Sequence, residues 1–426
     1  MTIAIIGAGY VGLPLAIAFA NHHSVVCYDI NKSRINELKK GIDTNKQHLK
    51  KELIKNRLTF TCRHDKIENK DIYIITVPTP INNLNQPDLS MLKHVSLLVG
   101  KVMRQNSIII FESTTYPGCT EEFCIPLIEK TSKLKYKRDF DVAYSPERVN
   151  PGDEINTLKS ITKIVGANNL KTLKKIKKFY NSICKSIYTV NSIKIAESAK
   201  VIENIQRDVN IALVNELGVL FNKLDIPTNE VLKAASTKWN FHYYKPGLVG
   251  GHCISVDPYY LAYKAKQKNY LPKLILSGRK INESMGKYVA KQTIKLLSIN
   301  KKKLSNSNVA ILGFSFKDNI PDTRNTKVIQ IVNHLQKQKI KVKLFDTIAS
   351  RHEIKKKYKV DLYNFSNLKK FKYDAIILAV SHKEFLKNLN YYDKFYKSKQ
   401  NKIFIDVKNN YSSYNLNKNN YKFFQL

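Results

Sequence analysis

The 426 residues are more than one ordinary domain needs, and a hydrophobic fraction of 43% is enough to bury two or three cores, so we expect a soluble multidomain protein. No apolar run approaches the roughly 18 residues of a membrane span, and the N-terminal MTIAIIGAGY runs into a strand without a basic leader, which favours the cytoplasm and no membrane partner. The net charge of +38 suggests nucleic acid as a partner, but the lysines are scattered over the whole length. We therefore expect no nucleic-acid partner and a lysine-rich surface that helps to capture small anions.

The first elements form a βαβ unit. Residues 2–7 are an apolar strand ending at a glycine, residues 11–20 have helical apolar spacing, and residues 25–29 form a second strand. Further strands are predicted at 71–78, 107–113 and 141–146, alternating with helical segments. This order predicts a parallel, doubly wound sheet.

The turn between the first strand and helix carries the glycine pattern GAGYVG. Gly7 permits a tight turn, Gly9 lets a pyrophosphate approach the backbone, and Gly12 lets helix and strand pack closely. Asp29, at the end of the next strand, can accept hydrogen bonds from a ribose 2′-hydroxyl and would repel a 2′-phosphate, which favours NAD over NADP. Arg34 either covers the adenosine end or is an ordinary surface arginine, and a glycine-rich turn without ligand is the alternative for the whole motif.

A long helix is predicted for residues 193–224, followed by helices at 227–236 and 272–299. We expect this region to separate two α/β halves and to carry a dimer interface. Lys200 and Asn204 lie four residues apart on one face of the long helix, and Arg207 extends the polar stripe. Either the stripe is a solvated face or it faces a cleft.

The segment KPGLVGGHCISVDPYY contains a cysteine with unusual neighbours. The chain has six cysteines without CxxC or metal spacing, so we expect thiols and no metal site. Cys253 follows Gly250 and Gly251, which let backbone amides approach a ligand, and Asp257 lies within reach of the same pocket if the segment turns. The residues alone leave two interpretations open, a nucleophile and a buried apolar thiol.

A second α/β unit begins near residue 308, where VAILGFSF repeats the pattern of IAIIGAGY, and residues 341–346 and 373–380 repeat the later strands. Only Gly313 of the glycine motif remains, so we expect a ligand other than a dinucleotide. Lys317 and Arg324 follow the first strand, where two cations would suit a diphosphate or simply be surface charge.

We therefore predict an α/β protein with two Rossmann-like doubly wound domains, joined by a long central helix and a helical dimerisation region. The expected bounds are 1–190 for the NAD-binding domain, 191–300 for the helical region and 301–426 for the second α/β domain.

Seven motifs in order resemble the UDP-glucose and UDP-N-acetylhexosamine 6-dehydrogenase family along essentially the whole chain. They are GAGYVGLPLA with Asp29, TVPTP, ESTTYPGCTEE, YSPERVNPGD, AKVIENIQRDVNIALVNE, PGLVGGHCISVDPYYL and FKDNIPDTRNT. The wording of ERVNPG and GGHC is most similar to members that act on UDP-N-acetylhexosamines, above all UDP-N-acetylglucosamine, in capsular and O-antigen pathways. UDP-glucose is the alternative substrate.

This resemblance implies a four-electron oxidation of the sugar C6 alcohol to a carboxylate with two NAD⁺ in turn. Cys253 would trap the aldehyde as a thiohemiacetal and then hold a thioester. Lys200 with Asn204 would manage the hydroxyl proton and the oxyanions. Asp257 and Thr114 would orient the hydrolytic water, and Glu147 would be the general base.

The resemblance also assigns the binding residues. UDP-sugar contacts are implied for Glu147, Arg148, Lys200, Asn204, Arg207, Gly247, Gly250, Lys317 and Arg324, and the NAD side is implied for Tyr10, Val11, Thr79 and Thr114. One departure is Ser255, where the family has a proline; this change removes no catalytic group.

Two other functions remain to be weighed. A two-electron β-hydroxyacid dehydrogenase also combines a Rossmann domain with a lysine and an asparagine, but it needs neither Cys253 nor residues 308–408. A nucleic-acid-binding protein on a dinucleotide scaffold would explain the charge alone. No motif requires it.

Overall fold

The computed structural model describes residues 1–45, 48–149, 155 and 157–426. It contains two compact units. The N-terminal unit comprises Met1–Glu203 and Tyr259–Leu271, and the C-terminal unit comprises Asn204–Pro258 and Pro272–Leu426. Within the described residues, no helix combines the length and apolar character that crossing a membrane requires.

The N-terminal unit is built on an eight-stranded sheet with the order β3-β2-β1-β4-β5-β6-β7-β8. Its strands are β1 (Thr2–Ile6), β2 (Ser24–Tyr28), β3 (Leu58–Thr61), β4 (Ile72–Ile75), β5 (Ile108–Phe111), β6 (Asp141–Tyr144), β7 (Thr162–Ala167) and β8 (Ser186–Val190). The predicted parallel sheet is confirmed, except that β6 and β7 pair antiparallel. This reversal places the chain after β6 beside the start of β7.

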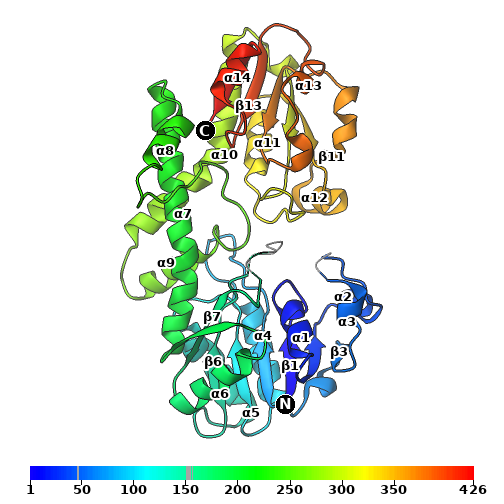
Figure 1. Ribbon diagram of the computed structural model, residues 1–426, viewed down its shortest axis with the longest axis vertical. Helices are drawn as coiled ribbons and strands as arrows, with labels where there is room; N and C mark the ends of the chain where they lie inside the picture. Colours follow the sequence, from blue (N-terminus) through cyan, green and yellow to red (C-terminus); the bar gives the residue numbers. More distant parts are fainter. Residues whose placement is uncertain (46–47, 150–154, 156) are drawn as a thin grey trace. The chain divides into compact units, whose positions relative to one another are not determined.

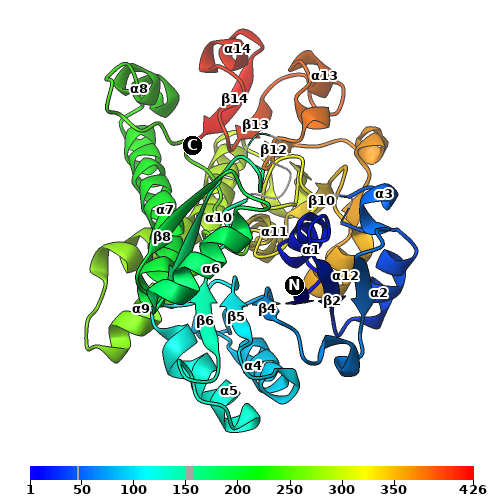
Figure 2. The same ribbon diagram turned by 60° about the horizontal axis from the view of Figure 1, so that its bottom comes forward.

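Helices cover both faces of this sheet. They are α1 (Gly12–Phe19), α2 (Lys32–Lys39), α3 (Lys50–Leu53), α4 (Ser90–Val102), α5 (Ile125–Ser132) and α6 (Leu170–Tyr180). Figure 2 shows α4 and α5 on one side of the central strands and α1 and α6 on the other. Because both faces are covered, β4 and β5 are apolar throughout and fully buried rather than alternating.

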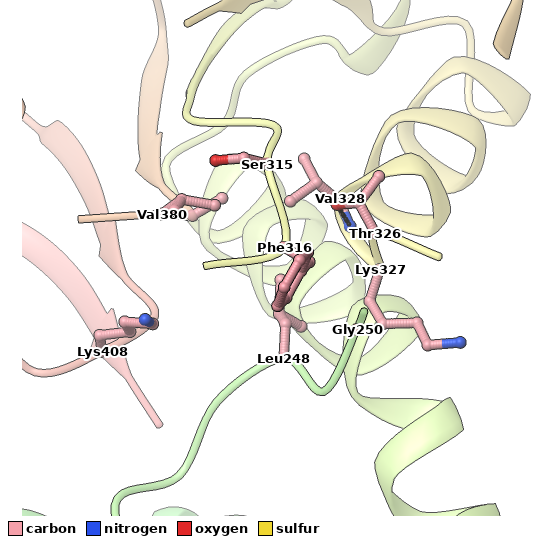
Figure 3. Close-up of a pocket in the computed structure, with 10 residues that line it drawn as sticks. Leu248, Gly250, Ser315, Phe316, Thr326, Lys327, Val328, Val380 and Lys408 are labelled. Atoms are coloured by element: carbon pink, nitrogen blue, oxygen red, sulfur yellow. Dashed lines mark hydrogen bonds between the residues drawn. The ribbon is translucent and has the colours of Figure 1, made fainter. Parts of the chain in front are cut away.

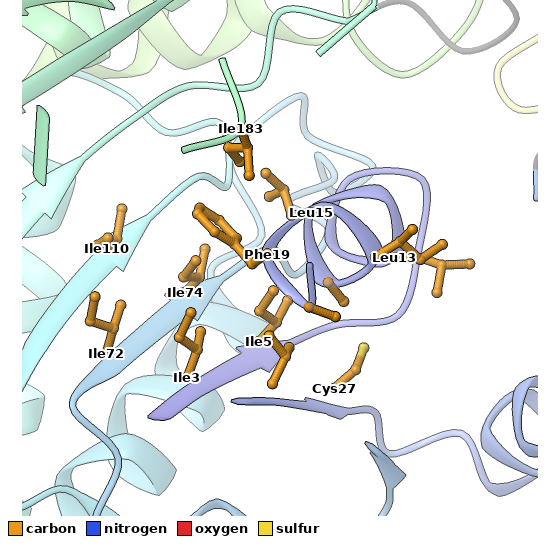
Figure 4. Packing of buried hydrophobic residues seen from close by; sticks show 14 of the residues in the cluster. Ile3, Ile5, Leu13, Leu15, Phe19, Cys27, Ile72, Ile74, Ile110 and Ile183 are labelled. Carbon is orange, nitrogen blue, oxygen red and sulfur yellow. The ribbon is translucent and has the colours of Figure 1, made fainter. Parts of the chain in front are cut away.

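The core on the α1 side is built from branched side chains of the central strands. Ile3, Ile5, Ile72 and Ile74 belong to one buried cluster with Phe19 of α1, and these five residues are at most 2% exposed (Figure 4). The predicted strands at 71–78 and 107–113 end earlier than expected, at Ile75 and Phe111. The residues that follow leave the sheet at its carboxyl edge, where parallel sheets bind ligands.

In chain order, four helices follow the first sheet and precede the second, and the predicted ones are confirmed. They are α7 (Ile193–Lys223), α8 (Thr228–Ala235), α9 (Asp257–Gln267) and α10 (Lys273–Ile299), coloured green to yellow in Figure 1. The division between the two compact units falls inside α7, after Glu203.

The C-terminal unit contains a six-stranded parallel sheet with the order β11-β10-β9-β12-β13-β14. Its strands are β9 (Asn308–Leu312), β10 (Lys341–Phe345), β11 (Leu362–Tyr363), β12 (Ala375–Leu378), β13 (Lys402–Asp406) and β14 (Tyr421–Gln425), and its further helices are α11 (Val328–Lys337), α12 (Arg351–Tyr358), α13 (Asn390–Asp393) and α14 (Ser413–Lys418). The order matches β3-β2-β1-β4-β5-β6, so the predicted repeat is confirmed.

Two buried clusters hold this second sheet, one on each face. Val309, Ile311 and Ile377 pack with α10 and α11, whereas Ala310 and Ile376 pack with aromatic residues around α13 and α14. Alternate residues of one strand point to opposite faces, so an apolar strand supplies both clusters.

Candidate active site

The glycine turn after β1 is shaped by its surroundings. Gly7 has φ +109°, and a Cβ there would lie 2.8 Å from the Thr76 carbonyl oxygen. A Cβ at Gly12 would lie 1.9 Å from the Gly7 oxygen, so no side chain fits where α1 packs on the turn. At Gly9 a Cβ would meet no atom within 4 Å. Gly7 and Gly12 therefore serve the protein's own packing, while Gly9 faces open space of the kind a pyrophosphate needs.

Asp29 lies at the end of β2, beside this turn. Its carboxylate accepts hydrogen bonds from the backbone N–H of Ala8 and of Asn31, both at 2.8 Å, and it is partly exposed. Arg34 is engaged close by, since its Nε donates to the Ala8 carbonyl and its guanidinium pairs with buried Asp43 at 2.8 Å. The turn and the carboxylate fit a dinucleotide, because amides, open space and a ribose acceptor stand together.

The carboxyl ends of β4 and β5 complete this edge. Thr79 Oγ1 donates to the Thr114 carbonyl oxygen at 2.7 Å, which ties the TVPTP and ESTT segments together. Tyr260 OH donates to the Thr79 carbonyl at 2.7 Å. Tyr10 and Val11 are partly buried at the start of α1. The side chains expected on the NAD side thus share one edge of the N-terminal sheet.

Glu147 and Arg148 follow β6, and both side chains form hydrogen bonds within the protein. Glu147 Oε1 accepts hydrogen bonds from the backbone N–H groups of Arg148 and Val149. Arg148 donates to the Thr162 carbonyl at 2.7 Å and pairs with Glu203 of α7 at 2.9 Å. The later part of this predicted motif, residues 150–153, lies outside the described residues.

A buried ionic cluster lies behind Glu147, and sequence reasoning missed it. Lys163 of β7 and Glu112 after β5 have fully buried side chains and pair at 2.7 Å, and the Tyr180 hydroxyl donates to Glu112. Burial raises the pKa of Glu112 to about 7, although Lys163 opposes this. A lysine inside the apolar run TKIVGA was the available signal, because such a lysine must have a partner.

Glu197 fastens the first turns of α7 to the loop after β5. Its carboxylate, 0% exposed, accepts hydrogen bonds from the N–H groups of Gly118 and Thr120 and from the hydroxyl groups of Thr115 and Thr120. Lys200, partly buried, lies three residues further along the helix. The helix that carries Lys200 is therefore fixed to the loop that carries Thr114.

Cys253 differs from most of the other cysteines. Cys27, Cys119, Cys124 and Cys184 are buried, whereas Cys62 and Cys253 are partly exposed. Burial raises the pKa of Cys27 to about 12 and that of Cys184 to about 11, which suppresses their thiolates. Cys253 instead lies where α9 begins, its carbonyl accepting the N–H of Asp257 at 2.9 Å.

The C-terminal unit joins two of the predicted residues. Asn204 Nδ2 donates to Asp257 Oδ2 at 2.6 Å, and both side chains are buried. Further along α7, the Asn215 amide both donates to the Gly247 carbonyl at 3.1 Å and accepts the Gly247 N–H at 2.8 Å. The segment that carries Cys253 is therefore held to α7 at both ends. Arg207 is exposed on the same helix.

Gly250 and Gly251 have a further reason to lack side chains. A Cβ at Gly250 would lie 2.9 Å from Phe316 and from the Asn325 oxygen, and Gly251 has φ +86° with the Phe316 ring 2.9 Å from its ideal Cβ. The glycine loop thus packs directly on the FKDNIPDTRNT segment. Protein atoms therefore exclude a side chain at both glycines, and the approach of a ligand to their backbone amides stays a prediction.

A small pocket of 10 Å³ opens at this junction. Its lining includes Leu248, Gly250, Phe316, Lys327 and Lys408. Figure 3 shows Phe316 in the middle, with Lys408 on one side and Lys327 on the other. Lys408 was not predicted. It lies two residues after the end of β13, at the edge where parallel strands bind ligands, and pairs with Asp318 at 2.8 Å.

The two cations predicted for a diphosphate, Lys317 and Arg324, differ in exposure and in their partners. Lys317 is exposed. Arg324 is partly exposed, and its guanidinium donates to both carboxylate oxygens of Asp322. His252, next to Cys253, lies 3.7 Å from the same carboxylate. Arg324 therefore also shapes the loop beside the thiol.

The C-terminal unit repeats the turn between the first strand and helix, but its carboxylate, Asp346, is buried by the protein's own groups. Asp346 corresponds to Asp29, and its Oδ2 accepts the N–H of Phe314 at 2.7 Å. His382 Nε2, fully buried, lies 3.1 Å from the same carboxylate, which is itself fully buried. No ribose hydroxyl can reach Asp346, so this unit does not fit a dinucleotide.

Comparison with known proteins agrees with this geometry. The sequence matches the UDP-glucose/GDP-mannose dehydrogenase family in three successive parts: the NAD binding domain over residues 1–184, the central domain over 194–284 and the UDP binding domain over 310–413.

Relatives match along nearly the whole chain. UDP-N-acetyl-D-glucosamine 6-dehydrogenase of Salmonella typhi is 49% identical over 90% of each chain, and Protein CapL of Staphylococcus aureus is 48% identical over 91% of each. The solved structure of UDP-D-ManNAc dehydrogenase from Pyrococcus horikoshii superimposes with a TM-score of 0.90 at 31% identity, covering 100% of this chain and 99% of that one. The chain belongs to the UDP-glucose/GDP-mannose dehydrogenase family and is an NAD-dependent nucleotide-sugar dehydrogenase.

Proposed function

We propose that the protein oxidises C6 of a UDP-N-acetylhexosamine, namely UDP-N-acetylglucosamine, to the carboxylate in two NAD-dependent steps through a covalent intermediate on Cys253. One observation carries the proposal. The partly exposed thiol stands at the beginning of α9, in a loop fixed to α7 by Asn204 and Asn215, while four other cysteines are buried. A covalent step needs an accessible thiol held in one position.

The first oxidation produces an aldehyde. Lys200 takes the proton of the C6 hydroxyl as a hydride leaves C6, and NAD⁺, when bound, accepts a hydride in each of the two oxidations. The thiol of Cys253 then adds to the aldehyde carbon and gives a thiohemiacetal. Lys200 and Asn204 stabilise the oxyanion. This bond keeps the aldehyde in the enzyme between the two oxidations.

The second oxidation converts the thiohemiacetal to a thioester. Glu147 removes the proton from water, which attacks the thioester carbon, and the C–S bond breaks to give the carboxylate and the free thiol. Asp257 and Thr114 orient that water. The hydrogen bond from Asn204 to Asp257 supports this assignment, because it holds the carboxylate at the start of the helix that follows Cys253.

The diphosphate and uridine are held in the C-terminal unit. We assign Lys317, Arg324 and Lys408 to the negative charge, and the backbone at Gly247 and Gly250 to close approach. The position of Lys408 in the lining around Phe316 supports this assignment. Arg148 and Arg207 contact the same substrate.

The choice of sugar follows the relatives. Those at 45–49% identity carry the name UDP-N-acetyl-D-glucosamine 6-dehydrogenase, apart from Protein CapL, whereas those at 30–33% carry the name UDP-N-acetyl-D-mannosamine dehydrogenase. We place the product in surface polysaccharide synthesis, capsule or O-antigen, in the cytoplasm.

We also propose a division of labour along the chain and a homodimer or larger homo-oligomer. Residues 1–190 bind NAD, residues 191–300 supply the contact between subunits, and residues 301–426 hold UDP. Exposed apolar side chains along α7 support the contact, with Leu213 54%, Leu220 48% and Leu224 56% exposed.

A substrate comparison tests the function. Production of NADH is measured with UDP-N-acetylglucosamine, UDP-N-acetylgalactosamine, UDP-N-acetylmannosamine and UDP-glucose side by side. We expect the highest kcat/KM with UDP-N-acetylglucosamine and two NADH per uronate. One NADH per turnover would contradict the four-electron reaction, and a higher kcat/KM with another sugar would correct the substrate.

The covalent step is tested by Cys253→Ala, with Cys62→Ala as the control because Cys62 is also partly exposed. We expect Cys253→Ala to lose steady-state formation of the acid and to stall near the aldehyde stage, and Cys62→Ala to keep full activity. Full oxidation by Cys253→Ala would exclude the covalent mechanism.

A further inference from the structure

The start of β7 holds the segment that carries Glu147. Because β6 and β7 are antiparallel, residues 145–148 run beside residues 162–165. Ser145 Oγ donates to the Ile164 carbonyl at 2.8 Å, Lys163 Nζ to the Pro146 carbonyl at 3.3 Å, and Arg148 to the Thr162 carbonyl at 2.7 Å. Three side chains thus pin the backbone on both sides of Glu147.

Lys163 also brings charge to this segment. Its ammonium lies 2.7 Å from Glu112 Oε2 and 4.0 Å from Glu147 Oε2. The side chains of Lys163 and Glu112 are 0% exposed, whereas that of Glu147 is 15% exposed. The buried ammonium of Lys163 therefore lies near two carboxylates, and of these two only that of Glu147 is exposed to solvent. Burial disfavours the charged lysine, but Glu112 and Glu147 outweigh this and raise the pKa of Lys163.

We propose that Lys163 is a positioning residue that orients Glu147 for its work as general base and supplies the buried positive charge that faces its carboxylate. The inference rests on the proposed function, because it presumes that role of Glu147. A carboxylate near a buried ammonium loses its proton more readily than one without it, since water does not screen the attraction. The hydrogen bond from Lys163 Nζ to the Pro146 carbonyl oxygen holds the backbone directly before Glu147.

Glu112 moderates this effect. When ionised, it competes with Glu147 for the same ammonium, and the Tyr180 hydroxyl holds it in place. In the part of the chain that the structure describes, further charged or titratable groups that face the cluster include Arg148, Glu203 of α7 and Cys184 before β8. Of the two cations named here, Lys163 has a fully buried side chain, whereas the side chain of Arg148 is 31% exposed.

The test compares pH profiles of kcat with UDP-N-acetylglucosamine for wild type, Lys163→Met, Lys163→Arg and Glu112→Gln. We expect the acidic limb of Lys163→Met to move at least one unit to higher pH, which is a tenfold loss of kcat below the limb. Lys163→Arg should return it toward wild type. The acidic limb of the Glu112→Gln profile should stay in place or move to lower pH, because Glu112 then no longer competes with Glu147 for the ammonium of Lys163.

Affinity for NAD and the unfolding midpoint are measured for each variant, since a purely structural role would change these and leave the limb in place. The double variant Lys163→Met/Glu112→Gln removes both buried charges and replaces Lys163→Met if that protein does not fold. If the acidic limb does not move in folded Lys163→Met or in the double variant, the inference is overturned and the proposed function stays intact. An acidic limb that moves to higher pH in Glu112→Gln also overturns the inference. If wild type oxidises no nucleotide sugar, the proposed function fails and the inference fails with it.

Discussion

Gly9 and Gly12 belong to the same motif, but single-residue geometry separates their roles. We expect Gly12→Ala to destabilise the protein by about 1–3 kcal/mol and to abolish NAD binding, because the new methyl would overlap the Gly7 carbonyl oxygen at 1.9 Å. Gly9→Ala should leave the free energy of unfolding within about 0.5 kcal/mol, because nothing lies within 4 Å, and should weaken NAD about tenfold or more. Urea unfolding and NAD titration measure the two effects. Equal loss of stability in both variants would contradict this division.

Asp346 makes the stability of the fold depend on pH. Burial would raise its pKa, but the hydrogen bond and charge of His382 and the backbone N–H groups outweigh it and lower the pKa to about 2. A depressed carboxyl pKa stabilises the fold above the unfolded pKa of about 4, and this stabilisation is lost as pH falls through 2. We expect Asp346→Asn to cost about 2 kcal/mol at pH 7 and progressively less below pH 4, measured by urea unfolding at several pH values. A difference that stays constant with pH would contradict this.

At the scale of elements, a buried polar network joins α7 to α10. Arg279, 1% exposed, donates to Asp208 Oδ1 at 2.6 Å, and Asn282 bridges Asp208 and Asn215, which holds Gly247. Because the Asn215 amide also binds the glycine loop, the packing of two helices determines where the loop before Cys253 begins. The loop is therefore positioned by residues that are distant in sequence.

Removal of the arginine tests this network. Arg279→Met leaves Asp208 buried without its cation, and we expect a loss of about 3–5 kcal/mol in the free energy of unfolding. The double variant Arg279→Met/Asp208→Asn should recover part of this loss, because no buried charge then remains. Urea unfolding of Arg279→Met, Asp208→Asn and the double variant measures the three losses of stability. If the loss in the double variant equalled the sum of the two single losses, the two charges would act independently.

At the scale of the whole molecule, the exposed apolar residues of α7 predict self-association. We expect Leu213→Asp/Leu220→Asp to shift the protein to the monomer, because desolvated carboxylates are not tolerated in a subunit contact. Leu84→Asp is the control, since Leu84 is 75% exposed in another part of the chain. Light scattering after size-exclusion chromatography gives the mass. A wild-type monomer, or an unchanged mass in the double variant, would exclude α7 as the contact.

The sequence alone determined the elements and the motifs, because strands, helices and glycine turns depend on neighbouring residues. The βαβ unit with Gly7, Gly9 and Gly12, the long helix from Ile193 and the repeat beginning near residue 308 were all predictable from local periodicity. The reversed direction of β7 was not, since strand direction depends on how the whole sheet is paired.

Only the tertiary structure decided which distant side chains meet. Lys163 meets Glu112 across 51 residues, Asn204 meets Asp257 across 53, and His382 meets Asp346 across 36. Nothing in the local sequence identifies such partners, because a buried charge or amide is stabilised by whatever group the fold brings within about 3 Å of it. The closed second turn at Asp346 depends on such a partner, and so does the ammonium behind Glu147.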